Sequence, residues 1–83
     1  QIEIKSTKRQ LDNLSKAITT AQISVNQAKE ALRIIEDRFD EGLEKSSDVL
    51  AAQSKVELQE LKYFQTIFNY NYTSYYLNFL TNN

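Results

Sequence analysis

The sequence predicts an all-α protein folded as an antiparallel coiled-coil hairpin, and three observations support this fold. Proline is absent and Gly42 is the only glycine among 83 residues, so helix breakers are almost missing. Apolar residues recur with a seven-residue period for six repeats before this glycine. The link after it is only about four to six residues long, and so short a connection makes neighbouring helices antiparallel.

The first helix is expected over about residues 3–41. All positions a and d of its heptad pattern are apolar except Thr7 and Gly42. These positions are Ile4, Thr7, Leu11, Leu14, Ile18, Ala21, Val25, Ala28, Leu32, Ile35, Phe39 and Gly42. A repeat kept this long specifies a helix of roughly 55 Å, at about 1.5 Å per residue, packed in a left-handed coiled coil.

The tip of the hairpin is expected at residues 42–46, where Gly42 takes the left-handed conformation and Leu43 folds back over the last turn. Five carboxylates surround this tip: Asp37, Asp40, Glu41, Glu44 and Asp48. Positions one, six and twelve of a calcium loop fit Asp37, Gly42 and Asp48, but Phe39 stands where the third ligand is needed. We therefore expect a hydrated acidic turn without a metal ion.

The second helix is expected over about residues 47–80. Ser46 or Ser47 is the expected cap, and Asp48 in the first turn complements the positive end of the helix dipole. The seam of this helix is interrupted by one glutamine and two threonines. It comprises Val49, Ala52, Val56, Gln59, Tyr63, Thr66, Tyr70, Thr73, Leu77 and Leu80.

A second set of apolar residues in the second helix lies outside this seam. It comprises Leu58, Leu61, Phe64, Ile67, Phe68, Tyr72, Tyr75, Tyr76 and Phe79. No charged residue follows Lys62, and eight of the nine aromatic residues fall between positions 63 and 79. Interspersed Asn, Thr and Ser argue against a membrane span. We expect this surface to pack against further helices of the same assembly, with contact to a membrane interface as the alternative.

Composition excludes several classes of function. Ten basic and eleven acidic residues give a net charge of -1, which suggests neither nucleic acid nor an anionic membrane as partner. Without Cys or His, the chain has no thiolate nucleophile and lacks the usual zinc ligands. No phosphate-binding glycine motif is present, and a two-helix hairpin offers no concave pocket. We expect neither an enzyme nor a cofactor.

The sequence of residues 31–80, "ALRIIEDRFDEGLEKSSDVLAAQSKVELQELKYFQTIFNYNYTSYYLNFL", resembles the outer-membrane efflux protein family of TolC-like channels. In that family a long helix ends in an Arg-aromatic pair and a Gly-Leu or Gly-Thr turn, and Asp-Val-Leu opens the returning helix with a Gln nearby. The matching residues here are Arg38-Phe39, Gly42-Leu43, Asp48-Val49-Leu50 and Gln53. The likeness covers about residues 28–80, and residues 1–27 add only a compatible coiled coil.

The resemblance implies a fragment of a trimeric channel of a Gram-negative bacterium, residues 1–83 being a periplasmic hairpin of its helical tunnel below an outer-membrane β-barrel. The tip, with Arg38, Gly42 and Leu43, would form the entrance for efflux or type I secretion and the docking site of a periplasmic adaptor. The inner-membrane transporter would be reached indirectly, through that adaptor. Asp48 matches the residue that lines the constriction and favours cations. Ala51 replaces a second acidic residue that the family often carries, and Glu41 replaces a small or apolar residue.

Two alternatives stay open on the residues alone. Asp48 is equally compatible with a simple charge at a helix start. Because heptads are common, the chain could instead be a coiled-coil interaction module, such as the hairpin of a periplasmic adaptor or a scaffold protein.

Overall fold

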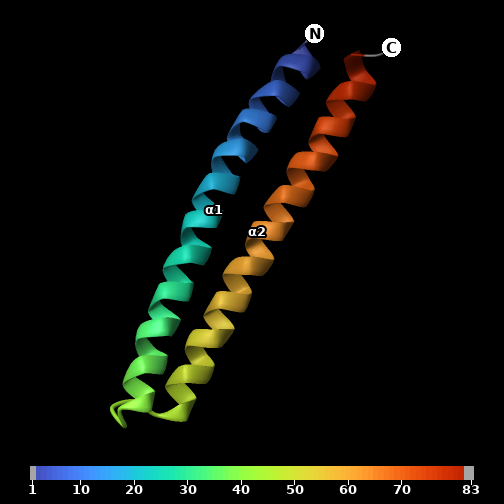
Figure 1. Ribbon diagram of the computed structural model, residues 1–83. Helices are drawn as coiled ribbons and strands as arrows, with labels where there is room; N and C mark the ends of the chain where they lie inside the picture. The colour runs from blue at the N-terminus through green and yellow to red at the C-terminus, as the bar shows by residue number, and fades with distance from the viewer. Residues whose placement is uncertain (1, 82–83) are drawn as a thin grey trace.

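The structure is a computed structural model that describes residues 2–81, and it consists of two long antiparallel helices (Figure 1). Helix α1 spans Ile2–Asp40 and helix α2 spans Ser46–Thr81. The molecule measures 63 × 14 × 14 Å, with both chain ends at one end and the turn at the other. The predicted hairpin is confirmed, and the helix bounds differ from the expected ones by one residue at each end.

The two helices meet along a single seam, which is the heptad pattern of the sequence. Val25 and Ala28 of α1 and Val56 of α2 are buried, with 7–8% of their surface exposed. Every other predicted seam residue of α2 is half-buried, as are the remaining predicted apolar residues of α1 from Ile4 to Ile35. Half-burial follows from the architecture, because each seam side chain has one neighbouring helix and is open to solvent on its flanks.

Phe39 and Gly42 were counted as the last seam positions, and both are exposed. Phe39 keeps 43% of its surface accessible. Helix α1 ends at Asp40, and α2 does not begin until Ser46. The heptad count therefore runs past the point where two helices face each other, and the last seam pair near the tip involves Ile35.

Two polar seam residues, Thr7 and Thr66, form side-chain hydrogen bonds within their own helix. Thr7 is only 4% exposed, and its hydroxyl donates a hydrogen bond of 2.8 Å to the carbonyl oxygen of Glu3. The Thr66 hydroxyl likewise donates to the carbonyl oxygen of Lys62 at 2.8 Å. Threonine is tolerated in the seam because the hydroxyl bonds to the carbonyl four residues earlier and leaves its methyl group for packing.

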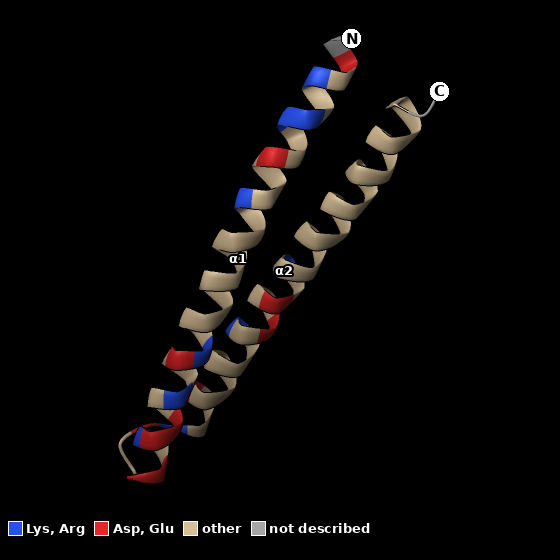
Figure 2. Cartoon of the chain, turned by 45° about the horizontal axis from the view of Figure 1, so that its top comes forward, with Lys and Arg blue, Asp and Glu red and all other residues tan. Residues whose placement is uncertain are grey.

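The surface of α2 that faces away from α1 is rich in exposed aromatic residues. Phe64, Phe68, Tyr72 and Tyr75 have between 62% and 76% of their surface exposed. This confirms that apolar residues of α2 lie outside the seam, although Ile67 is half-buried. Figure 2 shows the upper part of α2 free of charged residues, whereas α1 carries acidic and basic residues towards both of its ends. Within residues 2–81, neither helix contains a stretch long and apolar enough to cross a membrane.

Candidate functional site

The tip is closed by a glycine-dependent set of backbone hydrogen bonds. Gly42 has a φ of 79°. Its N–H donates to the carbonyl oxygen of Phe39 at 2.9 Å, and the N–H of Leu43 donates to the carbonyl oxygen of Arg38 at 2.8 Å. This pair of bonds is the Schellman motif, in which a residue at positive φ turns the chain back to satisfy the last carbonyls of a helix. The conformation predicted for Gly42 is confirmed.

Leu43 does not cover the last turn of α1 as expected. Its side chain is 58% exposed. The backbone alone completes the closure, through the N–H of Leu43, so the turn does not depend on an apolar contact from this residue. An exposed leucine at a rigid turn is a contact that a partner protein can use.

Arg38 makes an ion pair that spans the turn. Its Nε lies 2.8 Å from Oε1 of Glu44, whose side chain is only 23% exposed. The pair joins the last turn of α1 to the loop before α2. Sequence reasoning missed it, because a separation of six residues has no helical periodicity and the two residues meet only once the Gly42 turn is formed.

The start of α2 is capped by Asp48, and the expected serine cap is wrong. The carbonyl oxygen of Lys45 accepts the N–H of Val49 at 3.3 Å, which makes Lys45 the capping position and places Ser46 and Ser47 inside the first turn. Oδ2 of Asp48 accepts the N–H of Lys45 at 3.3 Å. This is the carboxylate half of a capping box, and it also places a negative charge at the positive end of the helix.

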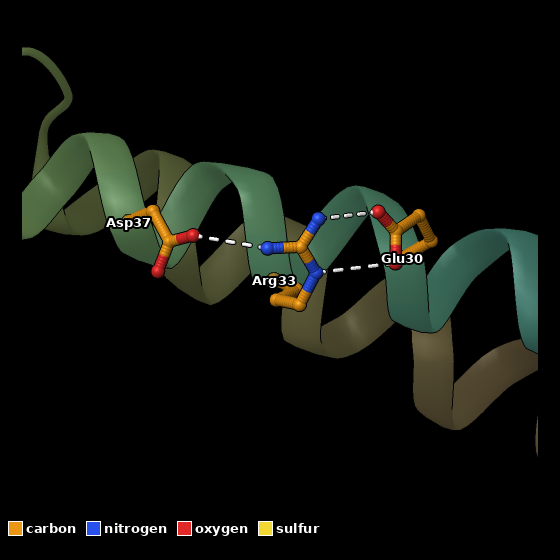
Figure 3. Close-up of polar contacts among 3 residues, drawn as sticks. All are labelled: Glu30, Arg33 and Asp37. Carbon is orange, nitrogen blue, oxygen red and sulfur yellow. Dashed lines mark hydrogen bonds and ion pairs between the residues drawn. The ribbon is translucent and has the colours of Figure 1, made fainter.

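A network of three charged residues lies on α1 just before the tip (Figure 3). Arg33 contacts Glu30 through Nε at 3.2 Å and through Nη2 at 2.5 Å, and its Nη1 lies 3.1 Å from Asp37. The hydrogen bonds and charge of Arg33 hold the pKa of Glu30 below its ordinary value. Glu30 in turn raises the pKa of Arg33.

Asp37 and Asp48, the first and last positions of the possible calcium loop, are thus engaged with Arg33 and Lys45 respectively. Among residues 2–81, no three His, Cys, Asp or Glu side chains gather in a group that could hold a metal ion.

A shallow groove of ≈ 430 Å³ runs between the helices next to the tip. Four alanines and Ile35 form its apolar lining, and Glu44, Asp48 and Lys55 supply its charged groups. The alanines are Ala28, Ala31, Ala51 and Ala52. This groove was not predicted from the sequence, although two alanines on each helix within a few turns of the tip are a signal for shallow packing.

The structure brings three of the four predicted site residues together. Arg38, Gly42 and Leu43 share the hydrogen bonds of the helix closure and form one rigid turn. Asp48 lies on the other side of the loop, in the first turn of α2, and its contact is with the backbone of Lys45.

Comparisons with protein-family models, with curated proteins and with solved structures gave no match to this chain. The hairpin offers a narrow, acidic tip with an exposed leucine at the end of two long helices, which is a geometry suited to docking.

Proposed function

We propose that the chain is a tunnel-wall hairpin of a TolC-like outer-membrane channel for efflux or type I secretion, with its tip at the periplasmic entrance. The observation that carries the proposal is the tip itself. A glycine-closed turn with Arg38 and Leu43 on one side and Asp48 opening the return helix is the arrangement that the family motif implies. With a length of 63 Å, the hairpin is long enough to form one segment of a tunnel wall.

Leu43 and the alanine-lined groove are the parts of the tip that would receive a periplasmic adaptor. Leu43 is exposed and held on a rigid turn, so little conformational entropy is lost when a partner covers it. Leu50, on the first turns of α2, is 63% exposed and adds a second apolar contact. The inner-membrane transporter would then be engaged through the adaptor.

Asp48 would line the constriction where three copies of the channel meet. One of its oxygens accepts the Lys45 N–H, which fixes the orientation of an exposed carboxylate near the tip. Three such carboxylates around one axis would attract cations and repel anions at the entrance. This role requires the trimer, outer-membrane location and periplasmic setting that the family resemblance implies.

Substitution of Leu43 in the full-length channel tests the docking role. Leu43→Ser should leave the hairpin folded and reduce adaptor-dependent export, because it removes a mostly exposed apolar side chain and keeps the backbone hydrogen bonds of the turn. Ile23→Ser is the matched control, since Ile23 is similarly exposed at 52% but lies in the middle of α1. Equal export by the two variants would remove Leu43 from the docking surface.

Conductance across a planar bilayer tests the constriction. Asp48→Asn keeps a side-chain oxygen that can accept the Lys45 N–H but removes the charge, so the full-length channel should lose cation selectivity while remaining folded. Glu36→Gln removes another exposed carboxylate on the tip half of α1 and serves as the control. Unchanged selectivity in the Asp48 variant would leave this residue with only its capping role.

A coiled-coil interaction module, such as a periplasmic adaptor hairpin or a scaffold, is the second candidate. The observation that favours it is the burial or half-burial of the seam along both helices, which would serve any hairpin of this length. The sequence that flanks the chain in its parent gene separates the two functions. A channel requires amphipathic β-strands on either side, whereas an adaptor requires flanking lipoyl and barrel domains.

A further inference from the structure

Three exposed charged residues of α2, Asp48, Lys55 and Lys62, follow one another at intervals of seven residues. A seven-residue spacing keeps side chains on one line of a coiled-coil helix. This line runs beside the seam, because its members stand one position before seam residues such as Val49 and Val56. The three side chains therefore lie on the same flank of the hairpin.

The α1 side of this flank carries no charge over most of its length. Its positions beside the seam are Gln10, Ala17, Ser24 and Ala31. Ser24, Ala31 and Lys55 border one hollow of ≈ 210 Å³, and Lys55 and Asp48 both border the groove next to the tip. We name these four residues of α1, together with Asp48, Lys55 and Lys62, the Asp48 flank.

The charges on the opposite flank are paired. Nζ of Lys29 lies 3.6 Å from Oε2 of Glu60, and both residues border a hollow on the other side of the seam. Lys55 and Lys62, in contrast, form no ion pair within residues 2–81. Positive charge is thus neutralised on the opposite flank and remains available on the Asp48 flank.

We propose that the Asp48 flank faces the lumen of the tunnel, where Lys55 and Lys62 form two cationic rings that bind the anionic groups of molecules in transit. The inference rests on the proposed function, because it requires Asp48 to line the entrance. If Asp48 faces the channel axis, residues one and two heptads later on the same line face it as well. Three copies around the axis then place three ammonium groups at each of the two levels.

The spacing keeps the acidic entrance and the cationic rings electrically distinct. Seven residues of helix measure about 10 Å, so Lys62 lies about 20 Å along α2 from Asp48. Screening in physiological salt acts over about 8 Å, and the Asp48 charge therefore offsets Lys55 only in part and Lys62 hardly at all. No charged residue follows Lys62 in the chain. A lumen lined in this way attracts cations at its mouth and anions behind it.

This orientation of the hairpin is compatible with an adaptor at the tip. Glu44 and Asp48 border the groove at its tip end, and Lys55 borders its inner end. An adaptor held by Leu43 meets the mouth of the channel. Lys62 lies one heptad further along α2, beyond the residues that border the groove.

Reversal potentials of the full-length channel in a planar bilayer, under a gradient of potassium chloride, test the rings. Combining Lys55→Gln with Lys62→Gln should raise the ratio of potassium to chloride permeability about two-fold or more, the effect of one unit charge on an ion about 10 Å away in water. Lys29→Gln is the matched control. It removes a positive charge at a similar level, beside Glu60 on the opposite flank, and should leave the ratio unchanged.

Two outcomes separate this inference from the proposed function. A conducting channel in which the double lysine variant keeps the parent's permeability ratio, or in which Lys29→Gln has an equal effect, would overturn the inference and leave the tunnel standing. A full-length protein that forms no pore in the bilayer would overturn the tunnel and the cationic rings with it.

Thiol labelling tests which flank faces the lumen. The 83 residues contain no cysteine, so Lys62→Cys and Lys29→Cys place single thiols on the two flanks of a channel without other cysteines. Sulfonatoethyl methanethiosulfonate adds a negative charge to an accessible thiol. It should shift the reversal potential of the Lys62 variant towards potassium selectivity and leave that of the Lys29 variant unchanged. The reverse result would place the opposite flank in the lumen and contradict the proposal.

Discussion

At the scale of single residues, Gly42 is the position on which the turn depends most directly. It has a φ of 79°, and a Cβ added there would meet no atom within 4 Å. Its substitution therefore tests backbone conformation alone, without a steric clash. Gly42→Ala should lower the free energy of unfolding by about 1 kcal/mol, measured by urea denaturation.

Gly42→Asn is the matched variant for this prediction, because asparagine adopts the left-handed region more readily than alanine does. It should cost clearly less than Gly42→Ala. Equal losses for the two variants would mean that the turn relaxes to another conformation when glycine is replaced.

Residue-scale features were predictable from the sequence only where one residue type has one physical role. The only glycine of the chain could be assigned to the left-handed position with no knowledge of its neighbours. The serine cap could not, because capping depends on where the helix begins to within one residue. A start at Ser46 transferred the cap to Asp48, and the ion pair of Arg38 with Glu44 depended on a loop geometry that no spacing rule describes.

At the scale of the helices, the seam was predictable because it repeats. A seven-residue period sustained over five repeats outweighs single exceptions such as Thr7, and burial follows it closely as far as Ile35. The period carries no information on where a helix stops, which is why Phe39 was wrongly included. Ala28 likewise fits the period without revealing that it lines a groove, and Ala31 lies outside the period altogether.

Adjacent isoleucines in α1 provide a test of the seam. Ile35 is a half-buried seam residue, and Ile34 is 46% exposed on the outer face. Ile35→Ala should lower the free energy of unfolding by about 1–2 kcal/mol, below the 2–4 kcal/mol typical of a fully buried site. Ile34→Ala should stay within about 0.5 kcal/mol of the parent.

Thermal or urea unfolding of both variants at one protein concentration gives the comparison. If Ile34→Ala is the more destabilising of the two, the buried and exposed faces of α1 are assigned the wrong way round.

At the scale of the whole molecule, the hairpin has one buried interface, between α1 and α2, and a second apolar face on α2 that stays exposed. The sequence predicted that face, because aromatic residues outside the heptad and the absence of charge after Lys62 need no structure to be noticed. The sequence could not identify what packs on this face, because an exposed apolar surface indicates a contact without specifying the partner. The folded helix adds only that Phe64, Phe68, Tyr72 and Tyr75 are all exposed along α2.

The open end of the hairpin is joined by a contact between the first turn of α1 and the C-terminal part of α2. The Tyr76 hydroxyl donates a hydrogen bond to Oε1 of Glu3, a residue 73 positions away in the chain. This hydrogen bond, with smaller effects of burial and of the Glu3 charge, raises the pKa of Tyr76 above its ordinary value. The contact is therefore linked to pH.

The folded state favours the neutral phenol of Tyr76, and this sets the direction in which pH changes the stability. A raised pKa means that the folded chain holds the Tyr76 proton more tightly than the unfolded chain does. The added stability is complete below the ordinary tyrosine pKa of about 10, and is lost as the pH rises through the folded-state value. Above that range the ionised phenolate and the Glu3 carboxylate repel each other, so the open end should loosen first.

Thermal unfolding followed by circular dichroism at pH 8 and at pH 11 checks this linkage. Tyr76→Phe cannot ionise at this position, so its melting temperature should fall less between the two pH values than that of the parent chain. Tyr75→Phe is the matched control, because Tyr75 is the neighbouring residue, is 76% exposed and lies on the outer face. It should retain the parent's full alkaline loss. If both variants reduce the loss of melting temperature equally, the effect comes from the combined charge of several ionised tyrosines. If Tyr76→Phe does not reduce it, the contact with Glu3 does not hold the open end together.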